Sequence, residues 1–386
     1  MSITRQRINL LREFSIPLIL GVLCALVWAN FDPEQYDIFV NKPLILGVSL
    51  HFLSNELFMV LFFGIAAVEI TQSFLPGGDL TPLRRAVNPL FATVGGVVGP
   101  VGVYLLLNWF FGGPHLLRGW GIPTATDIAL AWLAAQVAFG ARHPAVSYLL
   151  LLAVVDDAIG LAIIAIFYPD PHFPVEPAWL TLVFTGMLAA WLLRSSAIKS
   201  YWPFLLIGGS LTWTGLHKAH LHPALALVFV VPFLPHPRQE RKRLFEEDLQ
   251  DTSALSRFEH EWKVVVDFGL FMFGLANAGV EISTLGAITW IILASLIIGK
   301  GGGILLFGWL GKMCGFDLPK GMGLNDLLLT GIIAGTGFTV ALFVAGEAFI
   351  EPAVRDAAKM GAMFSIVAAL LGIILATPLA IHKKKE

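Results

Sequence analysis

The sequence predicts an all-α polytopic membrane protein with about twelve transmembrane helices, and two observations predict this class. Hydrophobic residues make up 56% of the 386 residues and charged residues only 13%, whereas soluble domains carry about 25% charged residues. Apolar runs close to the ~20 residues that a helix needs to cross a bilayer recur along the whole chain. The polar loops between them are too short for a soluble domain, so we expect residues 1–386 to form a single integral membrane domain.

The apolar runs give the predicted spans in chain order. They lie near residues 14–30, 55–75, 86–111, 121–139, 145–168, 178–194, 202–216, 222–234, 263–280, 286–311, 325–349 and 357–381. The first run has a basic flank like a signal peptide but no convincing small-residue cleavage site, so we expect an uncleaved span. The seventh and eighth runs are short, which leaves eleven spans as an alternative count.

The lysines and arginines predict the orientation, because cytoplasmic loops are enriched in these residues. With the N-terminus inside, most of the 25 lysines and arginines are cytoplasmic. The exceptions are Lys42, Arg118, Lys218, Arg355 and Lys359 outside, and Lys300 within the membrane. An odd number of spans would place the HKKKE tail outside, so we expect an even number with both termini in the cytoplasm.

The first outer loop, residues 30–50, contains the segments YDIFV and LILGV. Their alternation predicts a small hairpin outside the membrane. An exposed strand edge can pair with another copy of the chain, so this loop is a signal for a dimer.

Two adjacent carboxylates, Asp156 and Asp157, lie in the middle of the apolar run LLLLAVVDDAIGLAIIA at 149–165. An acid at the centre of a spanning helix costs at least ~2.5–3.5 kcal/mol on insertion scales, and such residues mark ion or proton pathways. The alternative is a structural acid pair that a buried base neutralises.

Two spans near 121–139 and 325–349 are interrupted. In GWGIPTATDIALAW (119–132), Pro123 opens the helix ahead of Thr126 and Asp127, and irregular backbone at this depth must be buried in protein or line a cavity. In the late span, Gly335, Thr336, Gly337 and Thr339 interrupt an apolar run.

The regions 86–168 and 286–381 each have the interrupted span as the middle one of three, as expected for inverted repeats, and paired interruptions indicate a binding site in secondary transporters. The alternatives are that Pro123 simply begins a helix and that the glycines form a helix-packing face.

Lys300, in IILASLIIGKGGGILLFGWL, is a lone cation deep in a span and needs an anionic partner. It is not a phosphate-loop lysine, because Gly301 follows it instead of Ser or Thr. Neighbouring helical residues point about 100° apart, so one of Asp156 and Asp157 can face an ion site with Asp127 while the other faces Lys300. Carboxylates and hydroxyls suit Na⁺ or H⁺ better than soft metals.

Three histidines, at 217, 220 and 222, lie between the seventh and eighth spans. Their spacing near a helix end does not give a closed zinc site, and no cysteine joins them. We expect local packing or interfacial roles for His217 and His220.

The motifs GWGIPTATDIALA, VVDDAIG, ANAGV (276–280), GKGGGI (299–304) and AGTGFTVALFVA (334–345) occur in this order over nearly the whole chain. Together they resemble the NhaA family of sodium/proton antiporters. The resemblance implies a homodimeric transporter in the bacterial inner membrane, with two broken helices that cross. It implies electrogenic, pH-regulated exchange of cytoplasmic Na⁺ or Li⁺ for external H⁺, with no enzymatic activity, no cofactor and no nucleic-acid partner.

The resemblance also implies roles for individual residues. Asp127, Asp157 and Thr126 would serve the cation site, and Asp156 and Lys300 would form an ion pair that opens and closes with protonation. One departure concerns the family's pH-sensing cluster of acids and bases on the second helix, because here Glu69 is followed by Ile70, Thr71, Gln72 and Ser73.

Two other functions remain as alternatives. One is a proton- or sodium-coupled symporter of an organic solute on the same fold. The other is an intramembrane aspartyl protease with Asp127 and Asp157 as the acid dyad, although the Tyr-Asp and Gly-x-Gly-Asp settings of such enzymes are absent.

Overall fold

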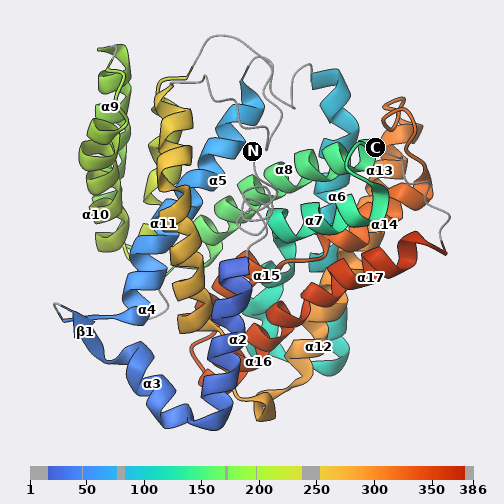
Figure 1. Cartoon of the computed structure of the whole chain (residues 1–386), viewed down its shortest axis with the longest axis horizontal. Helices are drawn as coiled ribbons and strands as arrows, with labels where there is room; N and C mark the ends of the chain where they lie inside the picture. The colour runs from blue at the N-terminus through green and yellow to red at the C-terminus, as the bar shows by residue number, and fades with distance from the viewer. Residues whose placement is uncertain are drawn as a thin grey trace, which may run out of the picture. The chain divides into compact units, whose positions relative to one another are not determined.

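The structure is a computed structural model of the whole chain (Figure 1). It describes residues 16–45, 47–75, 83–169, 173–196, 198–236 and 253–378. The chain divides into two compact units that are interleaved in sequence. The first unit comprises Met1–Ile16, Pro82–Gly160 and Val280–Glu386, and the second comprises Pro17–Thr81 and Leu161–Gly279. The prediction of a single transporter domain for residues 1–386 stays a prediction.

Helix occupies each of the twelve stretches that the sequence predicts as spans, which confirms the all-α membrane fold. Within the described residues, six helices are long and apolar enough to cross a membrane, and up to eight if each of two bent helix pairs counts as one span. The stretches near 14–30 and 222–234 form shorter apolar helices. Basic residues at 5–12, 238–243 and 383–385 lie outside the described residues, so the cytoplasmic position of both termini stays a prediction.

The second unit is built from helices and one small hairpin. Its elements are α2 (Ile16–Phe31), α3 (Pro33–Asn41), β1 (Pro43–Ile45), β2 (Val48–Ser49), α4 (Leu50–Phe52), η1 (Leu53–Phe58), α5 (Met59–Phe74), η3 (Pro177–Trp179), α9 (Leu180–Ser195), η4 (Phe204–Gly209), α10 (Ser210–Lys218), η5 (Pro223–Phe229), η6 (Val231–Phe233) and α11 (Ala254–Asn277). Helices α9 and α10 run side by side (Figure 1). Buried Tyr201, Phe204 and Phe258 belong to one hydrophobic cluster of this unit.

The hairpin prediction for residues 30–50 is right in kind and wrong in its first strand. The segment LILGV contributes to the antiparallel pair β1–β2, but YDIFV lies in helix α3. Pro33 begins α3, and the Asp32 side chain accepts a hydrogen bond from the amide of Gln35 at 3.1 Å. These N-terminal signals favour a helix, and they override the weak alternation of YDIFV.

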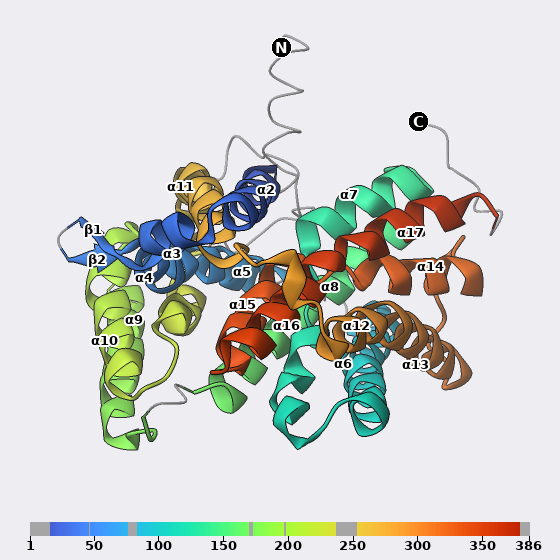
Figure 2. The ribbon, with the colours of Figure 1, turned by 90° about the horizontal axis from the view of Figure 1, so that it is seen from below.

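The first unit contains the two bent helix pairs. Its elements are α6 (Leu83–Phe111), η2 (Pro114–Thr124), α7 (Ile128–Phe139), α8 (Pro144–Phe167, whose last turns belong to the second unit), η7 (Ile282–Thr284), α12 (Ala287–Ala294), η8 (Ser295–Lys300), α13 (Gly301–Met313), α14 (Leu324–Ala334), α15 (Phe338–Ala348), α16 (Pro352–Phe364) and α17 (Ile366–Ala376). Figure 2 shows α17 beside α7 and α13 beside α6.

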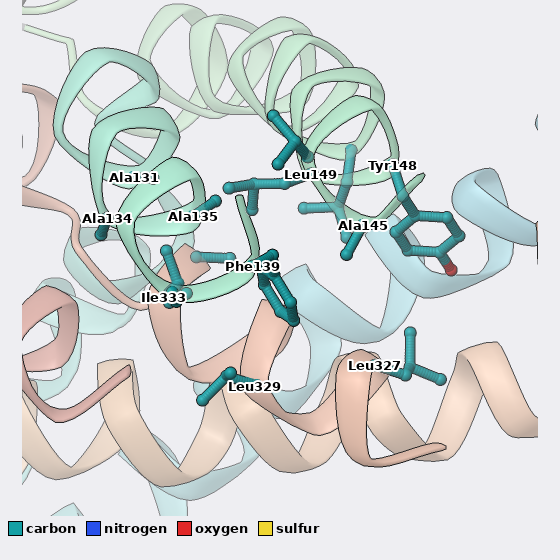
Figure 3. Close-up of a cluster of buried hydrophobic side chains, with 14 of the residues drawn as sticks. Ala131, Ala134, Ala135, Phe139, Ala145, Tyr148, Leu149, Leu327, Leu329 and Ile333 are labelled. Atoms are coloured by element: carbon teal, nitrogen blue, oxygen red, sulfur yellow. The ribbon is translucent and has the colours of Figure 1, made fainter. Parts of the chain in front are cut away.

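Small residues allow close helix packing in the first unit. A Cβ atom on Gly303 of α13 would lie 2.1 Å from the carbonyl oxygen of Gly95 on α6, and one on Gly95 would lie 2.2 Å from that of Gly303. Only glycine fits such a backbone contact, which is typical of helix interfaces in membranes. Alanines of α7 pack with Phe139, Leu149 of α8 and Ile333 of α14 in one cluster (Figure 3). This packing fixes the elements that carry the site.

Candidate functional site

The first broken helix consists of η2 and α7, which meet at 58°. Residues Ala125, Thr126 and Asp127 form the linker between them, and all three are buried. Pro123 cannot donate a backbone hydrogen bond, which favours the break at this position. Asp127 then begins α7 as its N-cap, because its Oδ1 accepts a hydrogen bond from the amide of Leu130 at 3.1 Å.

The second broken helix consists of α14 and α15, which meet at 48°. Its linker is Gly335, Thr336 and Gly337. A Cβ atom on Gly335 would lie 2.4 Å from the carbonyl oxygen of Leu296, so a larger residue would push the linker away from the neighbouring helix. The prediction of two interrupted spans near 121–139 and 325–349 is therefore confirmed.

The two linkers are hydrogen-bonded to each other. The amide of Asp127 donates to the carbonyl of Thr336 at 2.6 Å. The single hydroxyl proton of Thr126 is shared between the carbonyl of Ala334, the last residue of α14, at 2.9 Å and Asp156 Oδ2 at 2.8 Å. These bonds satisfy backbone groups that the two breaks free from regular helix. The broken helices meet at these linkers, in the interior of the first unit.

The Asp127 carboxylate joins the starts of two half-helices. Its Oδ1 caps α7, and its Oδ2 accepts hydrogen bonds from the hydroxyl of Thr339 and from the amide of Thr339 at 3.3 Å. Thr339 lies in the first turn of α15. Because a helix N-terminus carries partial positive charge, both ends stabilise a carboxylate here. The sequence analysis assigns no site role to Thr339. Its position just after the Gly-x-Gly break at 335–337 is the feature of the sequence that could have identified it.

Lys300 and Asp156 form a buried ion pair. The Lys300 Nζ donates to Asp156 Oδ2 at 2.6 Å and to the carbonyl of Thr124 at 2.6 Å, and both charged side chains are 0% exposed. Thr124 is the last residue of η2, so the ammonium also satisfies a helix C-terminal carbonyl. Lys300 ends η8, a π-helical segment, and such segments are frequent at functional sites.

The two carboxylates of α8 have different surroundings. Asp156 Oδ2 accepts from Lys300 and, at 2.8 Å, from the Thr126 hydroxyl, whereas its Oδ1 is buried without a partner among the described residues. Asp157 is partly exposed. Contacts thus bring together Thr126, Asp127, Asp156 and Lys300. Which of the two aspartates binds a cation stays a prediction, as does the opening of the ion pair.

Side-chain contacts in the second unit bear on two features of the sequence, the stretch after Glu69 and the three histidines. In the second unit, Gln72 Nε2 donates to Glu259 Oε2 at 3.0 Å, so a neutral amide of the stretch that departs from the family's acid–base cluster contacts this acid. His217 stacks on Trp213 and His220 on Phe173, with ring centroids 5.1 and 4.8 Å apart. These two histidines therefore take part in local aromatic packing.

Paired discontinuous helices around buried carboxylates are typical of cation antiporters. Comparison with known proteins leads to the same class. The chain matches the model of the family Na+/H+ antiporter 1 over residues 8–376 and belongs to that family. It is 65% identical over 379 residues to Na(+)/H(+) antiporter NhaA of Geobacter sulfurreducens, covering 98% of this chain and 99% of that protein. It is 61% identical over 386 residues to Na(+)/H(+) antiporter NhaA of Desulfitobacterium hafniense, covering 100% and 99%.

A solved structure shares the fold. The sodium proton antiporter MjNhaP1 from Methanocaldococcus jannaschii superposes with a TM-score of 0.51 at 13% identity, covering 98% of this chain and 99% of that chain. At this identity the likeness concerns the fold alone. The resemblance to the NhaA family is confirmed, and the comparisons do not support the symporter alternative.

Proposed function

We propose that this protein exchanges cytoplasmic Na⁺ or Li⁺ for external H⁺ across the bacterial inner membrane. The observation that carries the proposal is the fully buried Asp156–Lys300 pair next to the two joined linkers. Family membership and the names of the relatives support sodium and protons as the transported ions. No cofactor is needed for this exchange.

The charges of the site explain how one pathway couples two ions. Asp127, Asp156 and Asp157 with Lys300 have a net charge of −2 when all four are ionised. Two protons bring this charge to zero, while one Na⁺ brings it to −1. Protons and cation compete for the same carboxylates, so a loaded site that alternates between the two sides exchanges one for the other.

An exchange of two protons for one Na⁺ moves one positive charge inward. The membrane potential then drives Na⁺ out, with about 2.3 kcal/mol per charge for each 100 mV. Asp157, Asp127 and Thr126 supply oxygen ligands to the cation in this proposal. Asp156 and Lys300 form the pair whose opening accompanies protonation.

Regulation by pH and dimer formation belong to the same proposal. Regulation by pH is proposed from the resemblance to the NhaA family, and the neutral side chains of Thr71 and Gln72 after Glu69 imply a pH threshold of its own. Outside the membrane, the strand edges of the short hairpin β1–β2 can pair with a second copy, while the spanning helices contact the surrounding membrane lipid. Native mass spectrometry with and without residues 43–49 tests the dimer, and a loss of the dimer on deletion is the expected result.

The main test is Na⁺-induced proton release in reconstituted vesicles, followed by a pH-sensitive dye across a pH series. Wild type should release protons on addition of Na⁺ or Li⁺, and Asp157→Asn should be silent because a cation ligand is lost. Asp317→Asn, an exposed aspartate in a loop, is the matched control and should exchange normally. Normal exchange by Asp157→Asn would refute the assigned site, and absence of flux in wild type would refute the function.

A further inference from the structure

The linker of the second broken helix contains a buried hydroxyl that makes no hydrogen bond with any described residue. Thr336 is 0% exposed, and its Oγ1 has no hydrogen-bond partner among the described residues. Other buried hydroxyls of the first unit are bonded: Thr124 to the carbonyl of Gly121 at 2.8 Å, and Thr330 to that of Asp326 at 2.7 Å. Because buried polar groups are nearly always satisfied, an exception calls for an explanation.

The backbone of the linker explains why Thr336 is placed differently from Thr330. Thr330 lies within α14 and bonds back to the carbonyl four residues earlier, as threonines in helices commonly do. Thr336 lies just beyond the end of α14, where the helix no longer continues. Its side chain thus retains a donor and an acceptor for another molecule.

Contacts on both sides hold the linker beside the carboxylates. The Thr336 carbonyl accepts the amide of Asp127 at 2.6 Å. On the other side, Ser365 Oγ accepts the amides of Gly337 at 3.2 Å and Phe338 at 3.0 Å, and it donates to the carbonyl of Ala362 at 2.6 Å. These hydrogen bonds hold the backbone of Thr336 between the start of α15 and the backbone of Asp127.

We propose that the Thr336 hydroxyl is a specificity-determining ligand of the transported cation, directly or through one water molecule. This inference rests on the proposed function. A hydroxyl oxygen is a hard, neutral donor, which suits a small monovalent cation. Because it carries no charge, it contributes to cation affinity and to the choice between Na⁺ and Li⁺, but it leaves the number of exchanged protons unchanged.

Three variants separate the effect of the Thr336 hydroxyl from the effect of the side chain's branched shape. Thr336→Val removes the hydroxyl and keeps the branched shape, Thr336→Ser keeps the hydroxyl, and Thr330→Val removes a hydroxyl that a helix carbonyl already satisfies. A hydrogen bond or ligand contact to a charged group is worth roughly a tenfold change or more in affinity. We expect Thr336→Val to raise the half-saturating Na⁺ concentration about tenfold with little change in maximal rate, and to alter the Na⁺/Li⁺ preference.

Thr336→Ser and Thr330→Val should stay close to wild type in both constants. In the absence of Na⁺ and Li⁺, Thr336→Val should unfold at the same temperature as wild type or a higher one, because it removes an unsatisfied buried polar group. The rise in unfolding temperature on addition of Na⁺, which reports binding independently of transport, should be smaller in Thr336→Val.

Each result decides the inference. Equal cation affinity and preference in Thr336→Val and wild type would overturn it, as would an equal loss in Thr336→Ser or a lowered maximal rate with unchanged half-saturation. The Na⁺-dependent rise in unfolding temperature tests the role of the Thr336 hydroxyl in cation binding, and proton flux of the wild type in vesicles tests the proposed function. Normal wild-type flux with unaltered Thr336→Val binding would refute only the hydroxyl's role, whereas wild-type binding without proton flux would refute only the exchange.

Discussion

Removing one member of the Asp156–Lys300 pair should destabilise the protein through an isolated buried charge. In Asp156→Asn the Lys300 ammonium keeps the Thr124 carbonyl at 2.6 Å but loses its anionic partner in a site where both side chains are 0% exposed. Breaking a buried ion pair from one side typically costs about 3–5 kcal/mol. The double variant with Lys300→Met should recover part of this loss, because no unpaired charge is left.

The expected shift in unfolding temperature follows from the size of the chain. An unfolding entropy of about 2.1 cal/mol/K per residue gives about 0.8 kcal/mol/K for 386 residues. A loss of about 3–5 kcal/mol then lowers the midpoint by roughly 4–6 °C. Thermal unfolding of the purified proteins in detergent, at one pH and without Na⁺ or Li⁺, measures this shift.

The control for this measurement is Asp317→Asn, which also replaces an aspartate but lies exposed in a loop. Its midpoint should equal that of wild type. A midpoint for Asp156→Asn within about 1 °C of wild type would refute the argument from an isolated charge. A double variant whose loss equals the sum of the two single losses would show that Asp156 and Lys300 do not stabilise each other.

Two further predictions concern packing and pH. Gly303→Ala should cost about 1–3 kcal/mol or more, because its Cβ would lie 2.1 Å from the Gly95 carbonyl oxygen, while Gly302→Ala, which meets nothing within 4 Å, should be tolerated in the same unfolding assay. In the second unit, the Tyr201 hydroxyl bonds to Glu261 and holds the pKa of that carboxyl below its ordinary value of 4.5. A lowered pKa stabilises the fold above pH 4.5, so the loss of stability in Tyr201→Phe should be largest at neutral pH and shrink as the pH falls below 4.5; a loss that does not vary with pH would contradict this linkage.

The sequence by itself determined the spans, the positions of the two breaks and the polar groups inside the membrane. Spans are visible because a helix in lipid needs a long run of apolar side chains. Breaks are visible because Pro123, Gly335 and Gly337 act on the local backbone. Asp156 and Lys300 are visible because burying a charge in lipid is costly wherever its partner lies. The segment YDIFV shows the limit of such patterns, since the capping residues before it decide its structure as helix α3.

Only the tertiary structure decided which of these groups meet. The contact of Lys300 with Asp156 joins residues 144 positions apart, and that of Thr339 with Asp127 joins residues 212 positions apart. Helix rotation and tilt fix such pairs, and these depend on close approaches such as that of Gly95 to Gly303. The unsatisfied hydroxyl of Thr336 is likewise invisible in the sequence, because local pattern cannot tell whether a threonine beyond a helix end finds a partner. Packing decides this, since it places each backbone carbonyl within or beyond the reach of the side chain.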